Sequence, residues 1–128
     1  MGVEVLLADD DIEVRRILAE AFRKRGVRIT EASSGDHLLD EMQAHAFDLI
    51  VSDVRMPGMT GIQALRVMPP HDTPVILISA FSDDETRAEA ASLGATLFSK
   101  PFDIDELLAF AMPLTRGDNH ADPRSTSR

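Results

Sequence analysis

The sequence predicts an open α/β fold in which helices cover both faces of a parallel sheet. The first observation is a set of short runs of branched aliphatic residues that are continuous rather than alternating, as in strands buried on both faces. The second is that a stretch with helical periodicity follows each run, so that strand and helix alternate about five times. The third is size: 128 residues, 44% of them hydrophobic, suit one domain with one core.

The strands are recognised by their aliphatic content. The four clearest are Val3–Ala8, Phe47–Ser52, Pro74–Ser79 and Ala95–Ser99. A weaker fifth strand, Val27–Glu31, follows Gly26, at a point where the preceding helix needs a left-handed stop. Its lower apolar content is typical of a strand at the edge of a sheet.

The helices are recognised by apolar residues that recur on one face. The first carries the clearest stripe, with charged residues such as Arg15 and Arg16 assigned to its solvated face and Asp11 to its cap. Asp103 suits the start of the last helix. The predicted helices are about Asp11–Arg25, Gly35–Ala44, Gly61–Met68, Asp83–Leu93 and Ile104–Met112.

Composition excludes several classes of function. Twenty-two acidic against thirteen basic residues give a net charge of −9, which disfavours direct contact with nucleic acid. There is no cysteine, and no apolar run is long enough for membrane insertion or a signal peptide, so we expect a cytoplasmic protein. We predict one domain over residues 1–116 and a disordered polar tail over 117–128.

Unusual polar residues fall at the carboxyl ends of the predicted strands. Asp9 and Asp10 follow the first strand, Asp53 follows Phe47–Ser52, Ser79 ends the next strand, and Lys100 follows the last. In an open parallel sheet these ends border one crevice, so residues about forty positions apart converge there. We therefore expect three carboxylates, one hydroxyl and one ammonium to meet.

These groups predict a phosphoryl-binding metal site. Three carboxylates brought together repel, and a divalent cation relieves that repulsion. Because only oxygen ligands are offered, the expected ion is Mg²⁺, for which Mn²⁺ could substitute. Lys100 and Ser79 would then contact phosphoryl oxygens, and Asp53 is the candidate nucleophile that becomes an aspartyl phosphate.

In combination, these motifs resemble the receiver domains of two-component response regulators over about residues 3–114. The motifs are Leu7–Asp11, Ser52–Gly61, Ser79–Ala80 and Lys100–Phe102. The resemblance implies a flavodoxin-like, doubly wound sheet of five parallel strands in the order 2-1-3-4-5 with five helices. It also implies a phosphoprotein that works in signal transduction or a phosphorelay.

The resemblance further assigns roles at the acidic site. By it, Asp53 is the phosphoacceptor, Asp10 a direct Mg²⁺ ligand, and Asp9 the residue that places metal-bound water. Asp53 and the backbone carbonyl of Arg55 complete the set of metal ligands.

The remaining motif residues also receive roles by resemblance. Ser79 is the switch hydroxyl, and Lys100 is the phosphate-sensing lysine, followed by a cis peptide bond to Pro101. Gly58 and Gly61 would supply backbone angles forbidden to other residues in the loop after the acceptor.

One position departs from the family pattern. Receivers usually carry Tyr or Phe three residues before the lysine, and here Leu97 occupies that position, with Phe98 one residue later. Either Phe98 takes the role of the switch aromatic, or signalling does not use an aromatic rotamer.

The resulting hypothesis is a signalling switch that accepts a phosphoryl group from a sensor histidine kinase, or from a phosphotransfer protein, and then controls a downstream protein effector. It would be a slow catalyst of its own phosphorylation and dephosphorylation rather than a turnover enzyme. The alternatives are a receiver-like binding module that works without phosphorylation and a receiver fragment of a larger transcription regulator. Phosphorylation-dependent homodimerisation stays open.

Overall fold

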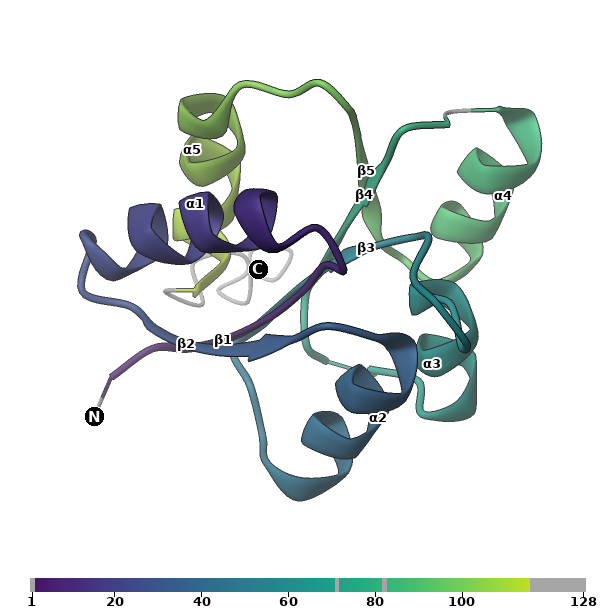
Figure 1. The fold of residues 1–128 in the computed structure, drawn as a ribbon, viewed down its shortest axis with the longest axis horizontal. Coiled ribbons are helices and arrows are strands. Elements are labelled where there is room, and N and C mark those ends of the chain that lie inside the picture. Colours follow the sequence, from purple (N-terminus) through teal and green to yellow (C-terminus); the bar gives the residue numbers. More distant parts are fainter. Residues whose placement is uncertain (1, 71, 82, 116–128) are drawn as a thin grey trace, which may run out of the picture.

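Strands and helices alternate along the chain in the computed structural model, which describes residues 2–70, 72–81 and 83–115 (Figure 1). The strands are β1 (Glu4–Ala8), β2 (Arg28–Ala32), β3 (Leu49–Asp53), β4 (Val75–Ser79) and β5 (Thr96–Ser99). The helices are α1 (Ile12–Arg23), α2 (Gly35–Ala44), α3 (Gly61–Val67), α4 (Asp84–Ser92) and α5 (Ile104–Thr115). The predicted alternation is confirmed, with boundaries shifted by a few residues.

The five strands form one parallel sheet in the order β2-β1-β3-β4-β5. This is the predicted order, and β2 lies at an edge as its weaker apolar pattern indicated. Ala8 is paired with Ser52, and Asp53 with Ile78, so the carboxyl ends of the three central strands lie nearly level. Residues that follow these strands therefore emerge at one edge of the sheet.

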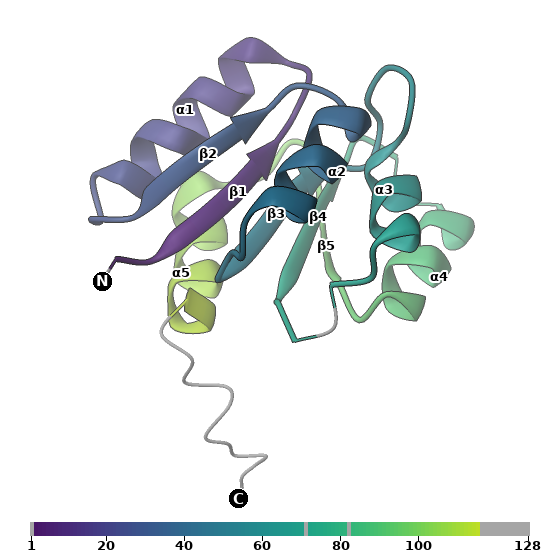
Figure 2. The same cartoon turned by 90° about the horizontal axis from the view of Figure 1, so that it is seen from below.

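Helices cover both faces of the sheet. Helices α1 and α5 lie on one face and α2, α3 and α4 on the other (Figures 1 and 2). Along β1, Leu6 packs into the cluster beneath α2 and α3, whereas Leu7 packs into the cluster beneath α1 and α5. Both faces are apolar, which explains the continuous aliphatic runs; each such buried side chain contributes roughly 1.5–3 kcal/mol to stability.

Helix ends follow the capping residues expected from the sequence. The Asp11 carboxylate accepts hydrogen bonds from Glu13 N and Val14 N, at 3.0 and 3.3 Å. Gly26, after α1, has a φ of 80°, the left-handed conformation that glycine favours.

Among the described residues, no helix is long and apolar enough to cross a membrane.

The last helix is longer than predicted. Helix α5 passes through Pro113 and ends at Thr115 rather than at Met112, because Leu114 and Thr115 continue its packed face. The Thr115 hydroxyl donates to the Met112 carbonyl at 2.7 Å. The predicted polar tail, residues 117–128, lies outside the described residues.

A close contact at the start of α2 positions the loop after β3. A Cβ atom added to Gly35 would overlap the backbone carbonyl of Met59, so α2 lies directly against that loop. Only glycine allows this approach. The loop that follows Asp53 is thus held by the packing of a neighbouring helix.

We expect Gly35→Ala to destabilise the fold by about 1–3 kcal/mol, because overpacking against backbone outweighs the higher helix propensity of alanine. The free energy of unfolding in urea measures the effect. Gln43→Ala, at an exposed position of the same helix, is the matched control and should change stability by less than about 0.5 kcal/mol. A Gly35→Ala protein as stable as wild type would contradict the close contact.

Candidate functional site

Three carboxylates meet at the carboxyl edge of the sheet. Asp9 and Asp10 follow β1, Asp53 ends β3, and each offers a carboxylate oxygen within 4.8 Å of the others. Asp9 is 1% exposed and Asp53 5% exposed, whereas Asp10 is exposed. The structure therefore brings together the acidic residues that the sequence placed in one crevice.

Lys100 provides the positive charge facing this cluster. Its Nζ lies 2.7 Å from Asp53 Oδ2 and 3.7 Å from Asp9 Oδ2. Its backbone N–H donates to the Ser79 carbonyl at 2.8 Å, and the Lys100–Pro101 peptide is cis as expected. Although burial lowers the pKa of the Lys100 ammonium, the hydrogen bond and charge of Asp53 raise it above its ordinary value.

The Asp9 carboxylate is held in an unfavourable environment. The pKa of Asp9 is raised from 3.8 to about 6, chiefly by burial and further by the charge of Asp53. The hydrogen bond from Asp11 N to Asp9 Oδ1, 2.9 Å long, and the charge of Lys100 act in the opposite direction. Negative charge is thus only partly compensated by the protein.

The donor set fits a hard divalent cation. Asp9 Oδ2 is buried and accepts no hydrogen bond from the described residues. Three carboxylates face one ammonium, all the donors are oxygens, and the chain has no cysteine. An ion such as Mg²⁺ would bind through Asp10 and Asp53, with Asp9 close by, and would neutralise their repulsion.

Ser79 lies at the end of β4, beside the carboxylates, with its hydroxyl engaged in its own loop. The hydroxyl donates to the Phe81 carbonyl at 2.6 Å and accepts from the Phe81 N–H at 2.9 Å. The Arg55 guanidinium stacks over the Phe81 ring at 4.6 Å, while the Arg55 N–H donates to Asp53 Oδ1 at 3.0 Å. The β3–α3 and β4–α4 loops are thereby linked above the site.

The two glycines of the β3–α3 loop serve different purposes. Gly58 has a φ of 73°, as predicted. The same expectation is wrong for Gly61, which starts α3 without a positive φ. A Cβ at Gly61 would lie 2.5 Å from the Asp53 carbonyl and 2.7 Å from the Ser52 hydroxyl, so this glycine provides space rather than an unusual backbone angle.

The prediction that Arg15 lies on the solvated face of the first helix is also wrong. Its side chain is only 14% exposed and contacts the Asp9 carbonyl, whereas Arg16 is exposed as predicted. A signal was present in the sequence. Arg15 stands at the i, i+3, i+4 and i+7 spacing from Leu18, Ala19 and Phe22, which form the buried stripe of α1.

The sheet register separates the two candidates for an aromatic switch. Leu97 packs on the face that carries Ser79, in the same apolar cluster as Leu6, on the side of the sheet covered by α2, α3 and α4. Phe98 points to the opposite face and packs edge-to-face against Phe110 of α5, with ring centroids 5.7 Å apart. The position on the Ser79 face is therefore aliphatic.

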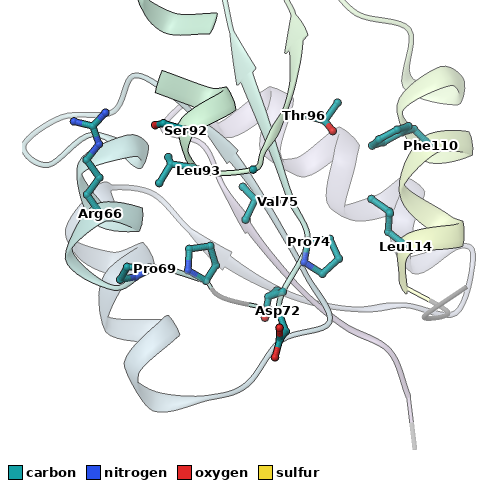
Figure 3. Close-up of a pocket in the computed structure, with 13 residues that line it drawn as sticks. Arg66, Pro69, Asp72, Pro74, Val75, Ser92, Leu93, Thr96, Phe110 and Leu114 are labelled. Atoms are coloured by element: carbon teal, nitrogen blue, oxygen red, sulfur yellow. The ribbon is translucent and has the colours of Figure 1, made fainter. Parts of the chain in front are cut away.

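A cavity of about 610 Å³ lies away from the acidic cluster (Figure 3). It is lined by Val75, the first residue of β4, and by Thr96, the first residue of β5, together with Leu93 and Phe110. The carboxylates stand at the opposite edge of the sheet, after β1 and at the end of β3. This cavity takes no part in the candidate site.

Comparison with known proteins identifies the family. Residues 5–111 match the family described as "Response regulator receiver domain". The chain is 37% identical over 110 residues to "Sporulation initiation phosphotransferase F" of Bacillus subtilis, covering 84% of this chain and 89% of that protein. The chain therefore belongs to the response regulator receiver domain family.

Longer relatives contain the same domain. The chain is 42% identical over 106 residues to "Regulatory protein AtoC" of Escherichia coli, covering 80% of this chain but only 23% of that protein. Among solved structures, the receiver domain of Francisella response regulator 1452 matches with a TM-score of 0.82 and 32% identity, covering 90% of this chain and 98% of that one. Vibrio cholerae CheY4 matches with a TM-score of 0.81 and 28% identity over 89% of this chain and 99% of that one.

The environment of Asp9 predicts a pH effect on the metal-free protein. Because the folded chain holds the Asp9 proton more tightly than the unfolded chain, this residue supports folding below its unfolded pKa of 3.8, and the support is lost as pH rises through about 6. At higher pH, Asp9→Asn should be more stable than wild type, by up to about 3 kcal/mol. Thermal melts in chelator across this pH range measure the difference.

Asp72→Asn, at an exposed position far from the site, is the charge-matched control and should follow the wild-type pH dependence. If Asp9→Asn were less stable than wild type at neutral pH, the carboxylate would be a stabilising group and its pKa would not be raised.

Proposed function

We propose that this domain is a phosphorylation-dependent signalling switch in which Asp53 accepts a phosphoryl group from a phosphohistidine. The observation that carries the proposal is the contact between Lys100 Nζ and Asp53 Oδ2, 2.7 Å, at the centre of a cluster of acidic residues. A carboxylate held by an ammonium, beside two further carboxylates that could bind a divalent cation, is suited to attack an electrophilic phosphorus.

In the transfer step, an Asp53 carboxylate oxygen attacks the phosphorus in line with the bond to the donor imidazole. A phosphorus–oxygen bond forms, the phosphorus–nitrogen bond breaks, and the imidazole nitrogen keeps the electron pair and takes a proton. Lys100 stabilises one non-bridging oxygen, and Ser79 donates to another. Mg²⁺, or Mn²⁺ in its place, would be held by Asp10, Asp53 and the Arg55 carbonyl. The ion would neutralise the remaining negative charge of the site and the phosphoryl group.

The resulting acyl phosphate is reset by water. A water oxygen attacks the same phosphorus, the bond to the Asp53 oxygen breaks, and inorganic phosphate leaves with the carboxylate regenerated. The domain thus acts on itself, as both acceptor and slow catalyst of dephosphorylation, rather than as an enzyme that turns over free metabolites.

A sensor histidine kinase, or a phosphotransfer protein, is the proposed donor. An apolar hollow of about 410 Å³ adjoins the site, and its lining includes Ile17 of α1, Lys100 and Phe102. Ile17 is 51% exposed, so α1 offers an apolar contact to a partner whose phosphohistidine faces Asp53. The proposed exchange places the domain in the cytoplasm.

Output would begin at Ser79. To donate to a phosphoryl oxygen, its hydroxyl must leave the Phe81 carbonyl, which it contacts at 2.6 Å. The β4–α4 loop would then change its position and alter the surface formed by α4, β5 and α5, which a downstream protein effector would recognise.

The proposal predicts metal-dependent phosphorylation at one residue. Incubation with acetyl phosphate and Mg²⁺ should increase the intact mass by one phosphoryl group, about 80 Da. Asp53→Asn should abolish the gain, because an amide oxygen is not an effective nucleophile towards phosphorus. Intact-mass spectrometry measures both, and a sample with chelator tests the metal requirement.

Asp72→Asn serves as the matched control and should be labelled as efficiently as wild type. Persistent labelling of Asp53→Asn would show that the acceptor is another residue. The absence of labelling in every sample would favour a binding module that acts without phosphorylation.

A further inference from the structure

We infer that Arg15 is a positioning residue that fixes the peptide between Asp9 and Asp10 and thereby sets the affinity of the acidic cluster for a divalent cation. The inference rests on the proposed function, since it concerns the metal that this function requires. It assigns a role to a residue outside the groups that carry the proposed chemistry.

The backbone of Asp9 is tied at both ends to the carboxyl end of β2. Its N–H donates to the Ala32 carbonyl at 3.0 Å, and its carbonyl accepts from the Arg15 guanidinium at 2.7 Å. The same guanidinium donates through Nε to Glu31 Oε1 at 2.9 Å. Arg15 therefore connects the first turn of α1, the Asp9 carbonyl and β2.

This connection controls how the carboxylates point. The Asp9 carbonyl belongs to the peptide that joins Asp9 to Asp10, so holding this oxygen fixes the plane from which the Asp10 side chain departs. Asp9 Oδ1 accepts from Asp11 N at 2.9 Å, which leaves its other oxygen, Oδ2, facing the cluster. Groups that orient metal ligands in this way commonly change metal affinity 10- to 100-fold when they are removed.

The contact is selective for arginine. The guanidinium offers two nitrogens in a rigid fork, one for a carbonyl and one for a carboxylate, whereas a lysine ammonium is a single point of charge. Glu31 is also paired with Arg23, at 3.3 Å, so its charge is compensated without Arg15. The bond to the Asp9 carbonyl is therefore the contact for which the chain has no substitute among the described residues.

An effect of Arg15 through its charge and an effect through positioning of the ligands predict different changes in cation affinity, which makes the inference testable. If Arg15 acted only through its positive charge, Arg15→Met would tighten cation binding, because a repelling charge is removed from beside the cluster. Arg15→Lys would then leave binding unchanged. If Arg15 positions the ligands, both variants weaken binding.

The experiment is a titration of the whole chain with Mn²⁺, in which the electron paramagnetic resonance signal of free Mn²⁺ reports binding at constant ionic strength and neutral pH. Arg15→Met and Arg15→Lys should each raise the Kd about tenfold or more. Arg16→Met and Arg16→Lys are matched controls, since Arg16 is the adjacent, exposed arginine of the same helix, and should stay within about twofold of wild type. Melting curves in chelator establish the temperature at which every variant is folded, and the titrations are made below it.

Each outcome decides the question. Weaker binding by both Arg15 variants, with unchanged Arg16 controls, supports the positioning role. Wild-type affinity in Arg15→Lys, or tighter binding by Arg15→Met, overturns it while leaving the proposed function intact. A wild-type protein that binds no Mn²⁺ overturns both.

Discussion

The repulsion between Asp9 and Asp53 is the constraint around which the rest of the site is arranged. Parallel pairing of β1 and β3 brings both carboxylates to one edge of the sheet, where burial removes the water that would otherwise weaken their interaction. Lys100, the residue after β5, compensates part of this charge from the far side of β4. The same topology that brings the carboxylates together therefore also supplies part of the compensating charge, and a bound divalent cation would supply the rest.

Several contacts hold the charged groups in place, and each restricts which residue can occupy its position. Arg15 connects the turn after β1 to β2, and Gly61 lets α3 begin directly against the Asp53 carbonyl. Gly35 lets α2 lie against the β3–α3 loop. Gly35–Met59 and Arg15–Glu31 are contacts between segments far apart in the chain, whereas Gly61 contacts the end of the strand just before it. In a less tightly packed backbone the repelling carboxylates would move apart. Tight backbone packing therefore helps to keep the pKa of Asp9 raised.

The fold was predictable from the sequence because its signals are local and agree with one another. Continuous aliphatic runs mark strands buried on both faces, and the carboxyl ends of such strands necessarily share one edge, which placed Asp53 beside Lys100. The role of Arg15 and the reason for Gly61 depend on three-dimensional contacts with backbone carbonyls, which periodicity and composition do not report. Even so, the position of Arg15 on the buried stripe of α1 was readable from its spacing to Phe22.

Under the proposed function, the imbalance of charge would also connect metal binding to switching. A phosphoryl group on Asp53 adds about one and a half to two negative charges to an edge that already carries more negative than positive groups. Among the described residues, Lys100 is the cation that contacts Asp53, and it already lies within hydrogen-bonding distance, so the added charge would have to recruit donors from elsewhere. Ser79 ends the neighbouring strand β4, and its hydroxyl could respond only by giving up its bonds to Phe81. Under the proposed function, compensation of this charge would displace the β4–α4 loop, although β5 carries no aromatic side chain on the Ser79 face.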